Sequence, residues 1–353
     1  MKLTSVCAII ILLLVSETSD AQTSYFDSLR QTKKVSYDSV RKDYIQSWSD
    51  KFYIKPILTV RFLNLIIEDE NKRVSDIVYS PSSNNFFGFS LYAFDLGVEL
   101  SFKLPQNEDE TPTEIFGETE SFDFQTNIYA KKWGADISFQ RYSSMYMEDP
   151  ASHYDDWIPG DPYPIREDLA LRYFQLSGFY LFNHEQFSLR SPYVQADRQL
   201  KSQGSFLLSM FVSTFSFSAD STLIPESAKP LYPENEEFRM MRTTTLALMP
   251  GYTYTLTKNH FYVNAAFSLG PGHLWIKYNK GDFEEEDIKF RPVIGLRGAI
   301  GYNGEKFFAG ITTNAQIVST QIDNLNVNSR SGNIKFFLGV RLQEFGVLKK
   351  ELF

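Results

Sequence analysis

The feature that most constrains this chain is a two-residue alternation of apolar and polar side chains that recurs along most of its length. The last segment to show it is GNIKFFLGVRLQ, residues 332–343, in which every second side chain is apolar. Successive side chains of a β-strand point to opposite faces, so this segment predicts a strand with one apolar face. Such a strand faces either a protein core and water, or lipid and the lumen of a membrane barrel.

Seven further segments show the same alternation, at residues 52–62, 96–103, 122–130, 133–140, 261–269, 294–301 and 307–316. A helical period fits none of them, so the sequence predicts an all-β protein. The chain has 353 residues and 16% aromatic residues, which is enough apolar surface to exclude disorder. Its net charge of -8 argues against nucleic acid as a partner, because phosphates require a basic face.

The N-terminus predicts export. Residues 1–21 have the layout of a secretory signal peptide, with Lys2, an apolar run and a cleavage site after Ala21. That run is too short to span a bilayer as a helix. Cleavage removes Cys7, the only cysteine, so disulfides and thiolate sites are not expected. A buried helix at the start of a soluble protein is the alternative. We expect a polar N-terminal periplasmic arm at 22–50 and a single β-barrel domain at 51–353.

The connections between the segments are of two kinds. Short turns read AKKWG, FNHEQ, LTKNH and YNGEK, and longer, mostly acidic loops read PQNEDETPTEIFGETE, EDPASHYDDWIPGDPYPIRED, PESAKPLYPENEE, NKGDFEEEDIK and IDNLNVNSRSG. Short periplasmic turns and long external loops are typical of an antiparallel transmembrane β-barrel of the outer-membrane type. Thirteen segments are readable as strands, and bacterial barrels have even numbers. A further strand over Ser218–Pro225 would give about 14 strands, with 12 as the alternative.

A secreted β-sandwich that acts as a binding module is the main alternative fold. Two observations favour the barrel: the apolar faces are rich in Phe, Leu and Ile in nearly every segment, and the polar faces carry isolated charges in mid-strand. These charges are the residues expected to face the lumen: Arg61, Glu99, Asp123, Asp136, Arg297 and Arg341.

Several stretches resemble a known family. They are DYIQSWSDKFYIKPIL, YAKKWGADISFQRYSSMY, QGSFLLSMFVSTFSFSADSTLIP, PGYTYTLTKNHFYVNAAF and RGAIGYNGEKFFAGIT. They are similar to an uncharacterised family seen in Bacteroidota and catalogued as domain of unknown function 4421, over most of the chain from Asp43 onward. The resemblance supports an outer-membrane barrel and implies no activity.

The sequence assigns no catalytic residue. An outer-membrane lipid hydrolase would need a serine paired with a histidine and an acid. His184 and His260 lie in predicted turns, and His153 lies in the loop ASHYDDW near Ser152. His273, near the outer end of a strand, is the best catalytic candidate, but a histidine of the barrel wall is the expected reading.

No cofactor or metal is expected either. The acidic run DFEEED (282–287) matches no calcium loop and reads as a solvated loop. The stretches GPG (270–272) and MPGY (249–252) precede no helix that could bind phosphate, so they read as bulges or bends in the wall.

Three functions remain open. The first is a porin-like conduit or binding barrel for a small solute, the second a lipid-modifying enzyme, and the third a structural or adhesive surface barrel. The expected partners are outer-membrane lipid and lipopolysaccharide, the barrel-assembly machinery and a small-molecule solute. The terminal Phe353 is suggestive of recognition by that machinery.

Overall fold

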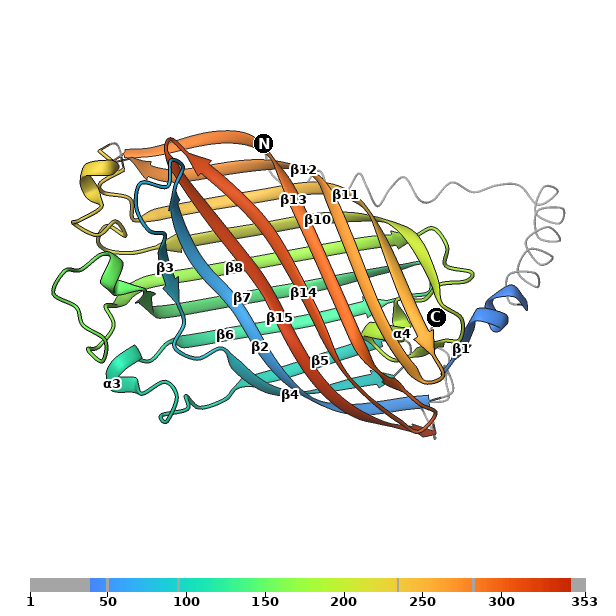
Figure 1. Ribbon diagram of the computed structural model, residues 1–353. Helices are drawn as coiled ribbons and strands as arrows, with labels where there is room; N and C mark the ends of the chain where they lie inside the picture. Colours follow the sequence, from blue (N-terminus) through green and yellow to red (C-terminus); the bar gives the residue numbers. More distant parts are fainter. Residues whose placement is uncertain (1–38, 49–50, 94–95, 234, 281–282, 344–353) are drawn as a thin grey trace.

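The computed structural model describes residues 39–48, 51–93, 96–233, 235–280 and 283–343. Within these residues the alternating segments form antiparallel strands that close into a barrel (Figure 1). No described helix is both long and apolar enough to cross a membrane. The predicted signal peptide, Cys7 and Phe353 lie outside the described residues.

One sheet contains thirteen strands, and it closes because β15 pairs with β2 along both of their lengths. The strands are β2 (Lys51–Asp69), β3 (Ile77–Ser80), β4 (Asn85–Ala93), β5 (Leu96–Lys103), β6 (Glu120–Tyr129), β7 (Trp133–Glu148), β8 (Ile165–Leu181), β10 (Gln203–Ser218), β11 (Met240–Lys258), β12 (Phe261–Lys280), β13 (Phe283–Asn303), β14 (Phe307–Ile322) and β15 (Leu325–Gln343).

The strand number lies within the expected range of twelve to fourteen. Both β3 and β4 pair with β2, β3 at Leu65–Ile67 and β4 at Tyr53–Val60, and β3 also pairs with β7. The ring therefore contains ten strands at the level of β3 and twelve at the level of β4, β5 and β6. The further strand expected over Ser218–Pro225 is absent, since β10 ends at Ser218 and residues 219–225 form a loop. The number is even at both levels, because either β3 alone or the three strands β4, β5 and β6 connect β2 to β7.

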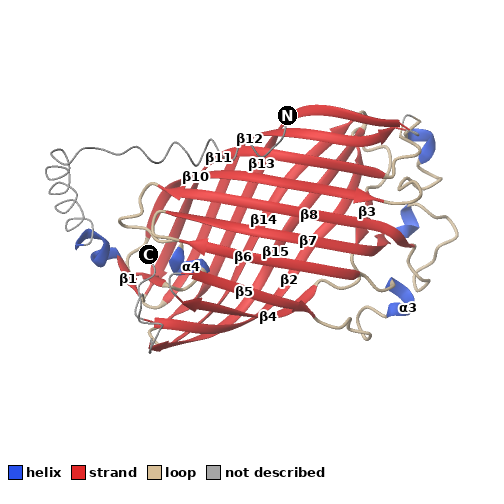
Figure 2. Ribbon diagram, turned by 180° about the vertical axis from the view of Figure 1, so that it is seen from behind, coloured by secondary structure: helices blue, strands red, loops and turns tan. Residues whose placement is uncertain are grey.

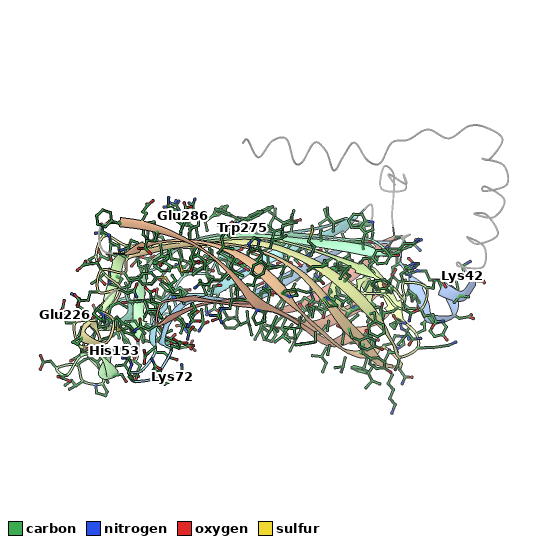
Figure 3. The ribbon with its side chains drawn as sticks, turned by 90° about the horizontal axis from the view of Figure 1, so that it is seen from above. Lys42, Lys72, His153, Glu226, Trp275 and Glu286 are labelled. Atoms are coloured by element: carbon green, nitrogen blue, oxygen red, sulfur yellow. The ribbon has the colours of Figure 1, made fainter. Side chains whose placement is uncertain are left out.

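The two ends of the barrel differ (Figure 2). We call one the turn end, because short turns at 130–132, 259–260 and 304–306 close it. We call the other the loop end. It carries the loops 104–119 with α3 (Thr113–Phe116), 149–164 with η1 (Pro150–Ser152) and 219–239 with η2 (Lys229–Leu231). In Figure 3, Lys72, His153 and Glu226 lie at the loop end and Lys42 lies at the opposite end.

Three predicted connections are wrong. NKGDFEEEDIK and IDNLNVNSRSG are not long loops, because β12 and β13 continue to residues 280 and 283, and β15 begins at Leu325. FNHEQ is not a tight turn either. It opens the segment 182–202, which contains α4 (Arg190–Tyr193) and β9 (Asp197–Gln199). β9 pairs with β1 (Ile45–Ser47) in the N-terminal arm.

The apolar side chains point outward in one half of the barrel and inward in the other half, as β10 illustrates. In the half of β10 near the turn end, the outward side chains are apolar and exposed, namely Phe206, Leu208 and Met210, while Ser205 and Ser209 point inward. In the half near the loop end, Phe211, Phe215 and Phe217 are buried inside, and Thr214, Ser216 and Ser218 point outward. The first half is typical of a wall in lipid, and the second of a barrel in water.

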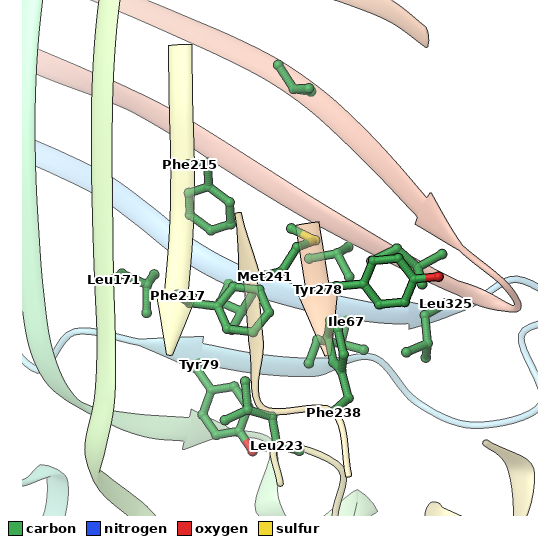
Figure 4. Close-up of a cluster of buried hydrophobic side chains, with 14 of the residues drawn as sticks. Ile67, Tyr79, Leu171, Phe215, Phe217, Leu223, Phe238, Met241, Tyr278 and Leu325 are labelled. Atoms are coloured by element: carbon green, nitrogen blue, oxygen red, sulfur yellow. Dashed lines mark hydrogen bonds between the residues drawn. The ribbon is translucent and has the colours of Figure 1, made fainter. Parts of the chain in front are cut away.

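The loop-end half consequently has an apolar interior, which we call the loop-end core. Strand residues such as Ile67, Phe217 and Tyr278 meet Leu223 and Phe238 from the loop 219–239 (Figure 4). All of these side chains are at most 6% exposed. Because this loop folds into the barrel mouth, its apolar residues close the lumen at the loop end.

We expect a charged side chain on the outward face of the turn-end half to destabilise the barrel. Leu338 on β15 is 59% exposed and lies midway along the apolar stretch between Ile334 and Leu342. Leu338→Arg should lower the free energy of unfolding by about 2–4 kcal/mol in lipid vesicles, measured with urea, because a cation at the bilayer centre loses hydration.

Asn326→Arg is the matched control, because Asn326 points outward on the same strand at its loop end. This change should cost about 0–1 kcal/mol, as it does near a membrane interface. Equal costs for the two variants would contradict the assignment of the apolar wall to lipid.

Candidate functional site

The interior of the barrel is the first place to look for a site, and it holds the six charges that the sequence singled out. Arg61, Glu99 and Arg341 are buried, as is the side chain of Asp123, and Asp136 and Arg297 are partly buried. Arg61 on β2 forms an ion pair with Asp123 on β6 and also covers the ring of Phe86, 4.3 Å from its centroid. The Arg61 and Asp123 side chains are 1% and 0% exposed.

Glu99 on β5 forms a second pair across the interior. The Nζ of Lys335 on β15 donates to both carboxylate oxygens of Glu99, at 2.8 and 2.9 Å. Lys55, on β2 between them in the wall, is also buried and donates to Gln195 Oε1 at 3.2 Å. Two cations thus accompany one buried carboxylate.

Asp136 on β7 accepts a hydrogen bond from Arg297 Nη2 on β13 at 2.6 Å. Tyr129 on β6 links the two residues: its hydroxyl accepts from Arg297 Nη1 at 2.6 Å and donates to Asp136 at 2.9 Å. Charge-assisted hydrogen bonds of this kind are about twice as strong as neutral ones.

These contacts join opposite walls of the barrel. β13 and β7 stand five positions apart in the ring of twelve, as do β15 and β7, which are linked by Ser331 and Gln140 at 3.4 Å. The remaining space is small. A polar cavity of about 50 Å³ is lined by Lys55, Glu99, Tyr129, Asp136, Arg297 and Lys335, among others. A second cavity, beside Arg297, has about 10 Å³. Spaces of this size fit water molecules.

The turn end is closed by a segment of the chain that we call the turn-end plug, residues 183–199. Its apolar side chains Phe187, Leu189, Val194 and Ala196 are buried against wall residues such as Tyr53 on β2 and Phe308 on β14. Figures 1 and 2 show α4, which belongs to the plug, at the end of the barrel beside β1. The plug is therefore a folded part of the barrel interior.

Hydrogen bonds tie the plug to many strands. Arg341, the sixth predicted residue, pairs with no acid among the described residues: its Nη2 donates to Gln195 O at 2.6 Å and to Asn303 Oδ1 at 2.5 Å. Tyr193 donates to Asn264 Oδ1 at 2.7 Å, and Asn303 donates to Asp197 O at 3.0 Å. Arg341 therefore holds the plug to the wall.

Asp197 is the charged centre of the plug. It accepts from Arg41 Nη2 at 2.9 Å and from the Ser188 hydroxyl at 2.7 Å, and the Arg190 Nε lies 3.8 Å away. Burial raises the pKa of Asp197, but the positive charges of Arg190 and Arg41 outweigh it, so this pKa lies below its ordinary value of 3.8. Arg41 belongs to the N-terminal arm, which is thereby anchored to the plug.

Sequence reasoning missed the plug and its partners. Lys55 and Lys335 stand at inward positions of the alternation, so the same signal that selected Arg61 would have selected them. The plug has a weaker signal: residues 182–202 separate two strands and contain Phe187, Leu189 and Val194, which is more apolar surface than a hairpin turn needs. Which wall residues it contacts is set by the tertiary fold alone.

In the described part of the chain, neither the ring of His153 nor that of His273 is hydrogen-bonded to a serine that it could activate as a nucleophile. His153 Nε2 lies 3.3 Å from the carbonyl oxygen of Asp76, while Ser152 donates to Asp149. His273 stacks on Phe290 with the ring centroids 4.7 Å apart, and Trp275 lies 4.1 Å away. His273 thus belongs to the outer aromatic wall.

Two other motifs lie in the strands of the wall. Glu284 and Asp287 of the acidic run pair with Lys277 and Lys289, at 2.6 and 2.9 Å. No group of three potential metal ligands occurs among the described residues. The stretches 249–252 and 270–272 face each other where the β11–β12 ladder is interrupted, between Ala247↔Gly272 and Gly251↔Ser268. They are irregularities of the wall, as predicted.

Removing one member of the buried pair Arg61–Asp123 should destabilise the barrel more than removing both. Asp123→Ala should lower the free energy of unfolding by about 3–5 kcal/mol, because it leaves the buried Arg61 without its anion. The double variant Arg61→Met with Asp123→Leu should lose much less, since no charge remains to be desolvated. Urea unfolding in vesicles measures both. A double variant as unstable as the single one would contradict this account.

The plug should loosen in acid. Because the pKa of Asp197 is lowered by folding, its stabilising effect is present above about pH 4 and is lost as the pH falls through the folded-state value. Hydrogen exchange of the amides at 186–199 should accelerate as the pH falls below about 4, relative to amides of the strands. Asp197→Asn should already exchange faster at pH 7 and show no such transition, whereas a transition that persists in this variant would exclude Asp197 as its cause.

The chain resembles solved outer-membrane proteins at low identity. The outer membrane protease OmpT of Escherichia coli is 9% identical, with a TM-score of 0.38, 84% of this chain and 98% of that chain covered. Ail, the attachment invasion locus protein of Yersinia pestis, is 14% identical (TM-score 0.26, 59% and 99%). The toluene transporter TodX of Pseudomonas putida is 8% identical (TM-score 0.26, 83% and 89%).

No curated protein matches the sequence. A family model does match it, over residues 36–342, which is nearly the whole of the described barrel together with part of the N-terminal arm. The resemblance seen in the strand and turn motifs is thereby confirmed. The chain belongs to the family described as domain of unknown function (DUF4421).

Proposed function

We propose that this protein is an outer-membrane barrel that is closed in its resting state and acts through its outer loops and its lipid-facing wall. The observation that carries the proposal is the set of contacts that join opposite walls, with cavities of only about 50 and 10 Å³ beside Arg297. An open porin needs a continuous aqueous lumen. Here the loop-end core, the ion pairs and the turn-end plug follow one another along the barrel axis.

The loops support a surface role because they are folded and acidic. The loops 104–119 and 149–164 contain nine acidic residues (Glu108, Asp109, Glu110, Glu114, Glu118, Asp149, Asp155, Asp156 and Asp161) and no Lys or Arg. An aromatic cluster orders them: Phe116 stacks on Tyr163 at 4.7 Å, and Trp157 lies 5.3 Å from Tyr163. A fixed acidic surface suits a basic partner, because complementary charge accelerates encounter and selects partners.

The proposal includes an orientation. The loop end would face outward and the turn end, with the N-terminal arm, would face the periplasm, as is usual for barrels with short turns on one side. Export would use the predicted signal peptide, and insertion would use the barrel-assembly machinery. No catalytic step is assigned, because the rings of His153 and His273 contact a backbone carbonyl and aromatic rings.

A gated conduit for a small polar solute is the second candidate. The turn-end plug favours it, because its anchors to the wall include polar contacts that can exchange with water, such as those of Arg341 and Tyr193. The polar cavity above the plug would be the solute-binding position. Passage would also require the loop 219–239 to leave the loop-end core.

Conductance in planar bilayers tests the proposal. The purified full-length protein should give no steady current, because its lumen is filled. Arg341→Ala, which removes the plug anchor, should give at most brief openings if the loop-end core also closes the lumen. Lys306→Ala is the matched control, a cation removed from an exposed turn at the same end. Steady conductance of the unaltered protein would overturn the closed barrel, and conductance induced by a solute would establish the gated conduit.

A further inference from the structure

A row of basic residues crosses the outside of the barrel. Residues directly opposite each other on neighbouring strands are Arg141 and Arg172, Arg172 and Ser216, Ser216 and Arg242, and Arg242 and Lys277. The five residues therefore share one level on β7, β8, β10, β11 and β12. Arg141, Arg172 and Arg242 are exposed, and the other two are half-buried.

We infer that these side chains point outward, since the residues next to them in the sequence point inward. Figure 4 shows Leu171, Phe217, Met241 and Tyr278 in the loop-end core, and each of them is adjacent in sequence to a member of the row. Successive side chains of a strand alternate between faces. The row thus lies on the outer wall.

The row marks the edge of the lipid-facing surface. One step toward the turn end, the outward side chains on β7, β8 and β12 are Phe139, Phe174 and Trp275, which are 38%, 40% and 41% exposed. One step toward the loop end, they are Ser143 on β7 and Ala170 on β8. Lipid headgroups lie at the level where an apolar wall with aromatic residues ends.

The three arginines have no anionic or hydrogen-bonding partner among the described residues. Arg141 and Arg172 are directly opposite each other, and like charges in that position repel. Lys277 differs, because it pairs with Glu284 at 2.6 Å and lies 3.9 Å from Glu286. The carboxylates of β13 therefore end the row, and the uncompensated positive charge lies over β7 to β11.

The wall is hollowed at this place. A surface hollow of about 300 Å³ is lined by Arg172, Ser216, Arg242 and Lys277. Glu284, the carboxylate that pairs with Lys277, lies at its β13 side. Arg172 and Arg242 stand two strands apart, which is about 10 Å at the usual strand spacing. Arginine binds phosphate through two parallel hydrogen bonds, and the Ser216 hydroxyl is a further donor between them.

We propose that Arg141, Arg172, Ser216 and Arg242 form a binding site for a lipid headgroup that carries two phosphates, in the leaflet around the loop end. The spread of the three arginines over four strands favours two phosphates over one. The acyl chains of the lipid would lie along the apolar wall below, beside Phe139 and Phe174. This inference rests on the orientation in the proposed function, in which the loop end meets the outer leaflet and its phosphorylated glycolipid.

The test is lipid retention by the full-length protein. The protein is reconstituted in nanodiscs with bisphosphorylated lipid A, monophosphorylated lipid A or phosphatidylglycerol, and bound lipid is counted by native mass spectrometry. Replacing Arg141, Arg172 and Arg242 by Gln should weaken retention of bisphosphorylated lipid A roughly tenfold or more, because charge-assisted contacts are lost. The control replaces Lys131, Lys258 and Lys306 by Gln, which removes three exposed charges at the turn end.

Unchanged retention in the arginine variant, or an equal loss in the lysine control, would overturn the site. Equal retention of phosphatidylglycerol would overturn the assignment to two phosphates. The single variant Arg172→Lys keeps the charge and loses the paired hydrogen bonds, so it should show an intermediate loss even where the triple variant folds poorly. Heat-modifiable migration reports folding. Conductance is measured separately. A barrel that conducts, but whose retention of lipid A still depends on the three arginines, would contradict the proposed function and not the lipid site.

Discussion

The structure depends on the requirement that every backbone polar group in lipid has a partner, because the hydrocarbon region offers no water to replace it. A closed antiparallel sheet meets this requirement, and the pairing of β15 with β2 is the step that removes its two edges. Closure then decides the chemistry of each face. The half near the turn end shows apolar side chains outside and polar ones inside, while beyond Arg141, Arg172 and Arg242 the same alternation carries apolar residues inside.

Charges inside the barrel are stable because they have hydrogen-bonding partners, most of them of opposite charge. Removing a carboxylate from water costs several kcal/mol, and a partner at hydrogen-bond distance repays that cost when the geometry is good. The barrel provides such partners across its lumen, with Arg297 and Tyr129 on Asp136 and Lys335 on Glu99. These contacts fill the lumen as well as neutralise it. The same residues that a pore would use to line its channel here hold its walls together.

The two ends of the barrel are closed by different means. At the loop end the loop 219–239 contributes Leu223 and Phe238 to an apolar core. At the turn end the plug is held by Asp197, which also binds Arg41 of the N-terminal arm, and by Arg341 on the final strand. Outside, the edge between the two halves of the wall carries cations that no described residue neutralises. Interior charges are satisfied by the protein, and those on this outer edge are the ones that we propose to bind lipid phosphates.

The sequence by itself determined the all-β class, the barrel class and the alternation of faces along most strands, because a strand has a period of two that needs no partner to be read. It predicted that Arg61 and Glu99 lie on polar faces. It misread the segment after Leu181 as a tight turn and Ser218–Pro225 as a strand, because the conformation of such a connection depends on the strands against which it packs. Only the tertiary structure decided that Asp136 meets Arg297, that Arg341 binds the plug and that three arginines share one level. Register between strands depends on pairing over long distances in the chain, and no local pattern of residues encodes it.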